Sequence, residues 1–97
     1  MIYTIDDIRE KAIPIAQKFG IKRLSLFGSY ARNEANDESD VDFIIDRGKI
    51  IGLIRYFAFV HALEDAFKRH VDVVTTGIRD KQFLDAIEAE GILLYEE

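Results

Sequence analysis

Apolar residues near the N-terminus recur at the spacing of an amphipathic helix. The periodic positions are Ile5, Ile8, Ala12, Ile15, Ala16 and Phe19. Thr4 followed by Asp7 is a capping-box variant that marks the start of this helix, and Gly20 is a natural stop. Pro14 lies inside the pattern, so we expect the helix to be kinked or split in two at that point.

The rest of the chain alternates between strand and helix patterns. We predict strands at 24–27, 41–45 and 70–75, one helical turn at 30–32, a turn region at 49–52, a long helix at 53–68, a last helix from Asp80 to Gly91 and an extended or strand-like tail at 92–95. This order predicts an α+β (or α/β) fold in which helices cover a small mixed sheet. The length suits one domain, residues 1–97.

Composition and charge exclude several classes of protein. The chain has no cysteine, so neither disulfides nor thiolate metal sites are available. No apolar run approaches the roughly 20 residues that span a bilayer, and the N-terminus does not look like a secretory signal. We therefore expect a cytoplasmic protein without a membrane partner. The net charge of −5 argues against general nucleic-acid binding, and an anionic substrate would need a bound divalent cation.

Three aspartates have the spacing of a metal site. Asp40 and Asp42 are two residues apart, at the start of the strand predicted at 41–45. They therefore point to the same side, opposite Val41 and Phe43. Asp72 repeats this pattern on the next valine-rich strand, so the three carboxylates converge if the two strands are neighbours. Hard oxygen ligands suit Mg²⁺ or Mn²⁺, and three carboxylates can hold two such ions for in-line phosphoryl transfer.

A phosphate-binding turn is predicted just before these aspartates. Gly28 lets the backbone approach a phosphate closely, and Ser29 offers its hydroxyl at the start of a helical turn. Arg32, one turn later, can add a charge-assisted contact to phosphate, although a position on the solvated helix surface is an equal alternative.

One segment of the chain resembles the signature of the nucleotidyltransferase superfamily related to DNA polymerase β. It consists of Gly28-Ser29, ten residues at 30–39 and then Asp40-Val41-Asp42. The short chain and the phrases FGSYAR and SDVDF look like the minimal nucleotidyltransferases (MNT) of prokaryotes. The resemblance implies a metal-dependent enzyme that transfers a nucleoside monophosphate from a nucleoside triphosphate, with two Mg²⁺ ions. Many such proteins are antitoxins that adenylylate (AMPylate) a tyrosine of a HEPN-domain ribonuclease toxin.

The same resemblance implies a role for each matching residue. Gly28 and Ser29 would bind the triphosphate of ATP, Asp40 and Asp42 would bind both metals, and Asp72 would help to activate the acceptor hydroxyl. The sequence departs from the family pattern after Arg32, where glycine is common and Asn33 stands instead. Since asparagine tolerates left-handed backbone geometry, the turn is expected to survive.

Two functions from different classes remain open. The first is a Mg²⁺-dependent adenylyltransferase acting on a HEPN-domain toxin, and the second is a non-catalytic antitoxin that neutralises its toxin by binding alone. The three aspartates favour the enzyme, because binding alone does not require them. A transferase for RNA ends or small molecules would lack a second domain to hold its substrate. The nucleotide base preference and a homo-oligomer are left open.

The long predicted helix has an unusually wide apolar arc. Its apolar residues cover about 220°, whereas a surface helix needs a stripe of little more than about 100°. The excess is either a deeply buried face or a partner interface, and in the second case Tyr56 and Phe59 would belong to the interface. His61 and His70 have no partner at metal-ligand spacing in the sequence and are expected on the surface; Tyr30 is expected to pack in the interior.

Overall fold

The computed structural model describes residues 2–46, 52–75, 82, 85 and 89–97. Its elements are α1 (Ile5–Phe19), β1 (Arg23–Phe27), α2 (Gly28–Ala31), β2 (Val41–Asp46), α3 (Leu53–Phe67), β3 (Val71–Thr75) and β4 (Ile92–Glu96). Each predicted strand is confirmed, and the apolar tail is the strand β4. The predicted turn at 49–51 and most of the helix predicted from Asp80 lie outside the described residues.

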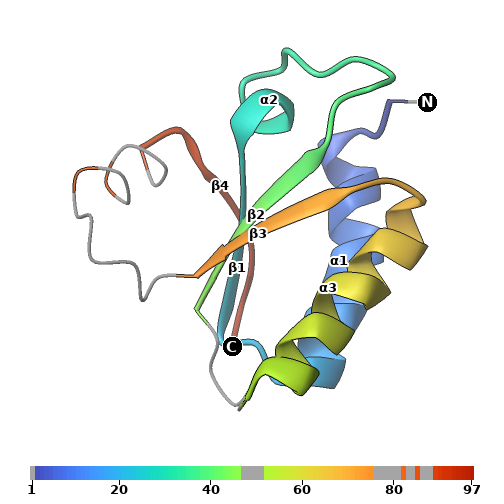
Figure 1. Cartoon of the computed structure of the whole chain (residues 1–97). Helices are drawn as coiled ribbons and strands as arrows, with labels where there is room; N and C mark the ends of the chain where they lie inside the picture. Colours follow the sequence, from blue (N-terminus) through green and yellow to red (C-terminus); the bar gives the residue numbers. More distant parts are fainter. Residues whose placement is uncertain (1, 47–51, 76–81, 83–84, 86–88) are drawn as a thin grey trace.

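The strands form a mixed four-stranded sheet in the order β3-β2-β1-β4 (Figure 1). β1 runs antiparallel to both of its neighbours, β2 and β4, whereas β2 and β3 are parallel. The parallel pair is joined through α3, which is the crossover expected for strands that run in the same direction. The predicted α+β class, with a small mixed sheet backed by helices, is thereby confirmed.

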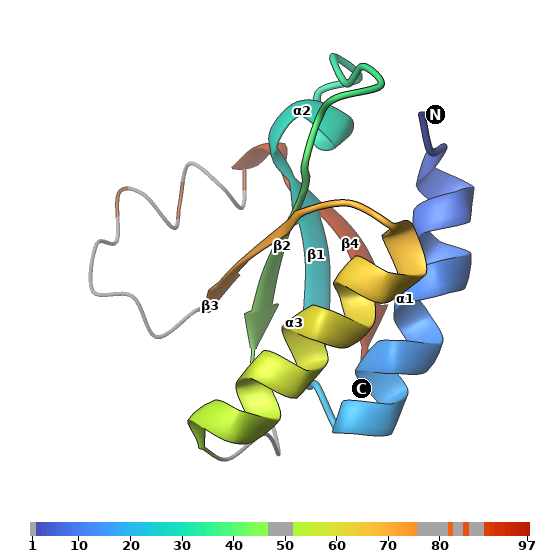
Figure 2. The same ribbon diagram turned by 45° about the vertical axis from the view of Figure 1, so that its right-hand side comes forward.

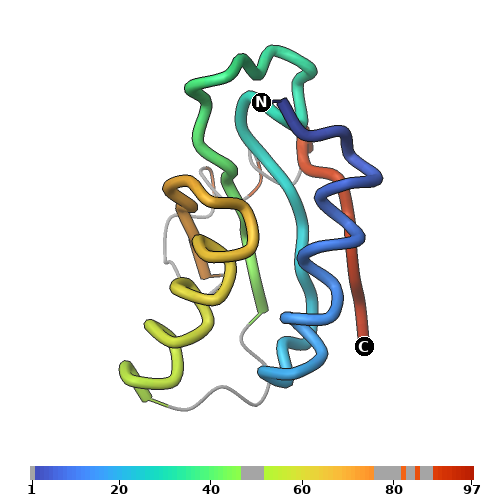
Figure 3. The backbone as a smooth tube through the Cα atoms, turned by 90° about the vertical axis from the view of Figure 1, so that its right-hand side faces the viewer, coloured from blue at the N-terminus to red at the C-terminus, as the bar shows by residue number. Residues whose placement is uncertain are grey.

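Both long helices lie on the same face of the sheet, side by side (Figures 2 and 3). Alternate strand residues Leu24, Leu26, Val41, Phe43 and Ile45 are fully buried in the core cluster that also holds residues of both helices. The rings of Phe19 on α1 and Phe59 on α3 meet edge-to-face at 5.6 Å between centroids. The functional residues must therefore come from the other face or from the ends of the strands.

The ends of α1 follow the sequence, but Pro14 does not interrupt the helix. The reciprocal capping box of Thr4 and Asp7 is present, and Gly20 ends the helix with a left-handed φ of 72°. Pro14 is exposed, and the carbonyl that it leaves without an amide donor belongs to the exposed Glu10. Because both residues lie on the exposed side of α1, the loss of this hydrogen bond is tolerated, one helix continues through the proline, and the predicted split is wrong.

The wide apolar arc of α3 is partly core and partly surface. Phe59 is fully buried, so its expected place in a partner interface is wrong: the residue is needed for the core between the helices. Tyr56 is half-buried, and its hydroxyl donates a hydrogen bond of 3.1 Å to the carbonyl of Val73. The large exposed apolar residues of α3 are Leu53, Ile54 and Phe57. Among the described residues no helix has the length and apolar character required to cross a membrane.

Candidate active site

The three aspartates converge on the sheet face opposite the long helices, as the sequence predicts. Asp42 on β2 and Asp72 on β3 are direct partners across the parallel pair. Asp40 precedes the first residue of β2 by one position and points to the same side as Asp42. The alternate residues Val41 and Phe43 are fully buried on the helix-covered face. The register of two parallel strands therefore places the carboxylates together.

Position 28 needs a glycine for two reasons, its backbone conformation and its closeness to the Asp42 carboxylate. It follows β1 directly, where Phe27 pairs with Asp42 across the antiparallel ladder. Its φ of +75° lies in the left-handed region, and a Cβ at this position would overlap Oδ2 and lie 3.0 Å from Cγ of Asp42. The glycine thus creates the space that the carboxylate occupies. A close approach of phosphate to Gly28, the role that the sequence suggested, stays a prediction.

The electrostatics of the cluster favour a cation. Burial and a hydrogen bond with Asp72 raise the pKa of Asp42 from 3.8 to about 6, and the charges of Asp72 and Asp40 act in the same direction. Arg32 opposes this effect through its positive charge. A carboxyl group that resists ionisation beside two others is stabilised in its charged form by a divalent ion. The donor set fits the Mg²⁺ that the resemblance implies, and also the Mn²⁺ that suits such hard oxygen ligands.

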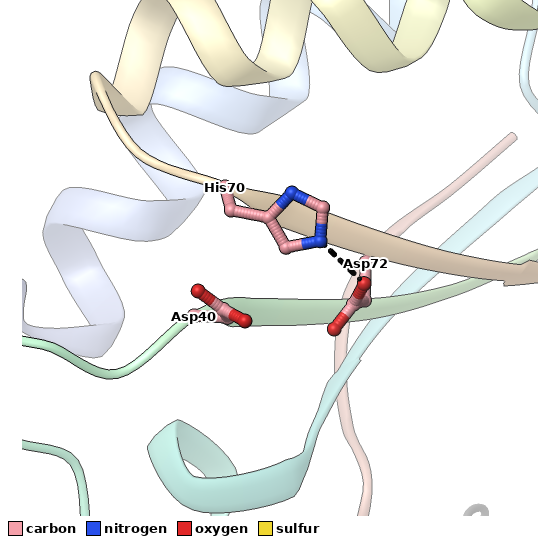
Figure 4. A group of neighbouring side chains, drawn as sticks. All are labelled: Asp40, His70 and Asp72. Carbon is pink, nitrogen blue, oxygen red and sulfur yellow. Dashed lines mark hydrogen bonds and ion pairs between the residues drawn. The ribbon is translucent and has the colours of Figure 1, made fainter.

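The sequence reasoning missed His70. Its Nε2 lies 2.8 Å from Oδ1 of Asp72, and its Nδ1 lies 3.3 Å from Oε2 of Glu64. One donor atom each of Asp40, His70 and Asp72 lie within 4.8 Å of one another (Figure 4). The expectation that His70 has no partner at ligand spacing is therefore wrong, although the residue is exposed as expected. Strand alternation was the available signal, because residues 70 and 72 share a side.

Ser29 lies on α2, and Arg32 is the C-cap residue of that helix. Ser29 is half-buried next to Gly28 in the chain, and its carbonyl accepts a hydrogen bond of 2.8 Å from the amide of Glu34. The Arg32 guanidinium lies 3.2 Å from Glu34 and 3.4 Å from Glu90, two exposed carboxylates, which is the arrangement expected of an arginine on the solvated surface. Their contacts with phosphate stay predictions.

Two other residues of the motif behave as the sequence indicated. Tyr30 is buried, and its hydroxyl accepts a 2.8 Å hydrogen bond from Arg69, which confirms a packing role. Asn33 has a φ of 60°, so it adopts the left-handed conformation for which glycine is common in the family. The turn after α2 is thus preserved despite the substitution.

Known proteins resemble this chain in sequence and in fold. The family model described as "Polymerase beta, Nucleotidyltransferase" matches residues 10–97. A relative from Methanocaldococcus jannaschii, named "putative protein adenylyltransferase", is 42% identical over 73% of this chain and 76% of its own length. A structure described as a "putative minimal nucleotidyltransferase" is similar with a TM-score of 0.78 and 26% identity, over 93% of this chain and 95% of that one. The MNT antitoxin complex with the tri-AMPylated HEPN toxin of Shewanella oneidensis is similar in fold, with a TM-score of 0.73 and 18% identity over 97% and 74% of the two chains.

Proposed function

The chain belongs to the nucleotidyltransferase family related to polymerase β, and we propose that it transfers AMP from ATP to a tyrosine of a HEPN-domain toxin and thereby acts as the antitoxin. The observation that carries the proposal is the convergence of Asp40, Asp42 and Asp72 beside the left-handed Gly28. Relatives named protein adenylyltransferases support the AMP donor and the protein acceptor. The AMPylated toxin in a structurally similar complex supports the partner.

The proposed chemistry is an in-line displacement at the α-phosphorus of ATP. Divalent cations, when bound, would neutralise the triphosphate and lower the pKa of the attacking hydroxyl. Asp40 and Asp42 would hold them against the nucleotide, while Gly28 and Ser29 position the phosphates. The phenolic oxygen forms a bond to the α-phosphorus as the bond to the β-phosphate oxygen breaks, and pyrophosphate leaves.

The proton of the acceptor needs a destination, because a tyrosine hydroxyl has a pKa near about 10. We assign this role to Asp72, which lies on β3 rather than at β2 and is exposed to an incoming partner. Its carboxylate would accept the proton and release it to solvent. Arg32, close enough to Asp42 for its charge to lower that residue's pKa, would contact the phosphates after exchanging an acidic partner for the anion.

Neutralisation by binding alone is the second candidate, and one observation favours it. Leu53, Ile54 and Phe57 form an exposed apolar surface on α3, with Ile54 89% exposed. Exposed apolar side chains clustered on one element are a common feature of protein interfaces. An antitoxin that docks through this surface could block its toxin without transferring AMP.

The two candidates are separated by removing the antitoxin after it has acted. A HEPN-domain toxin is incubated with the protein and Mg²⁺, with or without ATP, the proteins are separated under denaturing conditions, and the refolded toxin is assayed for ribonuclease activity. Transfer predicts inactivation that requires ATP and persists, with one or more tyrosines carrying AMP by mass spectrometry. Full recovery of toxin activity from both incubations, with no modified tyrosine, would refute the enzymatic proposal.

A further inference from the structure

We propose that His70 is a ligand of the divalent cation bound beside Asp40 and Asp72, and that its imidazole makes this site select Mn²⁺ or Zn²⁺ over Mg²⁺. The inference rests on the proposed function in one respect only, that a metal ion binds at the aspartate cluster. It adds a nitrogen ligand to a site that the sequence motif describes as carboxylate alone.

The imidazole of His70 is well positioned to bind a cation at the aspartate cluster. His70 immediately precedes β3 and lies on the same side of the chain as Asp72, so its ring faces the aspartate cluster (Figure 4). The separation of up to 4.8 Å between donor atoms of Asp40, His70 and Asp72 is close to the roughly 4 Å between opposite ligands of one ion. Because the His70 side chain is 60% exposed, it can move the remaining distance without disturbing the core.

A carboxylate supports the ring of His70 from behind. Glu64, half-buried on α3, lies 3.3 Å from Nδ1, on the opposite edge of the imidazole from Asp72. A metal-binding histidine characteristically donates its other ring N–H to such a carboxylate, which fixes the tautomer and leaves the second nitrogen free for the metal. Glu64 therefore directs Nε2 toward the aspartates.

A structural role for His70, in which it only hydrogen-bonds Asp72, is the alternative that must be excluded. Without an ion, Nε2 contacts Oδ1 of Asp72 at 2.8 Å. On metal binding this hydrogen bond would be exchanged for a bond from the Nε2 lone pair to the cation, and the proton would be released to solvent. The two roles differ in metal selectivity, because a residue that only positions Asp72 affects every cation alike.

The selectivity follows from the chemistry of the ligands. Imidazole nitrogen is a good ligand for first-row transition metals, and affinity at a given nitrogen-containing site rises from Mn²⁺ toward Zn²⁺. Mg²⁺ is a hard ion that prefers oxygen and retains its waters. Loss of the imidazole should consequently weaken Mn²⁺ and Zn²⁺ binding while leaving Mg²⁺ to the carboxylates.

The test measures metal binding to the full chain without nucleotide or toxin. Calorimetric titrations with Mn²⁺, Zn²⁺ and Mg²⁺ are compared for the wild type, His70→Asn and Glu64→Gln. His61→Asn is the matched control, since His61 also lies near Glu64, at 3.6 Å, but belongs to α3 and is absent from the aspartate cluster. We expect His70→Asn to weaken Mn²⁺ and Zn²⁺ binding at least tenfold, and Glu64→Gln to weaken the binding of the same ions about tenfold. Both variants should change Mg²⁺ binding less than about twofold.

A spectroscopic measurement on the unmodified protein makes the result independent of any variant. The chain has two histidines, so long-range ¹H–¹⁵N spectra resolve the two imidazoles during a Zn²⁺ titration. The expected result is a metal-bound Nε2 and a protonated Nδ1 in one ring, with the other unchanged. An unshifted His70 Nε2, or equal losses of Mg²⁺ and Mn²⁺ affinity in His70→Asn, would overturn the proposal. Because no toxin is present, a failed AMP-transfer assay leaves this result standing, and the reverse also holds.

Discussion

Replacing Asp42 by asparagine should stabilise the metal-free protein. Burial and the contact with Asp72 raise the pKa of Asp42 from 3.8 to about 6. A shift of that size corresponds to about 3 kcal/mol, and since the carboxyl is partly exposed, solvent screening reduces this to about 1 kcal/mol. Asparagine has nearly the same shape and can donate a hydrogen bond to Asp72 without carrying a charge. The melting temperature should therefore rise by about 4–8 °C at pH 8.

The pH dependence of this effect has a definite sign. Asp42 ionises near pH 4 in the unfolded chain and near pH 6 in the folded one, so the folded state binds more protons between these values. The free energy of unfolding of the wild type consequently falls as pH rises through this window. The advantage of Asp42→Asn should be full above about pH 6 and absent below about pH 4.

Denaturant unfolding of both proteins at pH 4 and pH 8, with EDTA, measures the difference. Mn²⁺ in place of EDTA provides an internal control, because a cation that binds the folded site should stabilise the wild type more than the variant. A variant that is equally or less stable at pH 8, or that keeps the same advantage at pH 4, would refute the reasoning about the carboxylate cluster.

Three further variants test separate parts of the structure. Gly28→Ala should lower the free energy of unfolding, measured with denaturant, by about 2–3 kcal/mol, because of the positive φ and the overlap with the Asp42 carboxylate. Gly52→Ala, at a φ of 83° with open space around it, should lower it by about 1 kcal/mol. Equal losses of stability in the two variants would show that the contact with Asp42 has no effect. Asp72→Asn should keep its affinity for Mg²⁺–ATP, measured by calorimetry, within a few-fold of the wild type, but its rate of single-turnover AMP transfer should fall at least about a hundredfold. A loss of ATP binding would place Asp72 in the nucleotide site instead. Phe57→Asp should leave the circular dichroism spectrum intact and weaken toxin binding, while Phe59→Asp should unfold the protein; an unaffected toxin affinity for Phe57→Asp would exclude the α3 surface.

Sequence patterns predicted the parts of this protein that depend on short-range rules. Strand alternation placed Asp42 and Asp72 on one side of their strands. The left-handed conformation of Asn33 followed from its side chain and from its place in the motif. In each case the deciding interaction lies within a few residues or follows from the two-residue period of a strand.

The features that the sequence did not reveal depend on tertiary contacts. Phe57 and Phe59 both belong to the apolar arc of α3, yet one is 53% exposed and the other is buried against α1. Periodicity gives the width of an apolar face but does not identify which edge another element covers. His70 lacks a motif, and its relation to Glu64 depends on the packing of α3 against β3. The continuity of α1 through Pro14 likewise depends on which side of the helix faces solvent.

The central claim is that Asp40, directly before β2, and Asp42, on β2, serve AMP transfer. The double variant Asp40→Asn and Asp42→Asn tests it most directly. The measurement is transfer of label from [α-³²P]ATP to a HEPN-domain toxin at saturating Mg²⁺ and, separately, saturating Mn²⁺, with folding verified by circular dichroism. We predict that the wild type labels the toxin on tyrosine and that the folded double variant does not. Equal labelling by the wild type and the double variant would contradict the account.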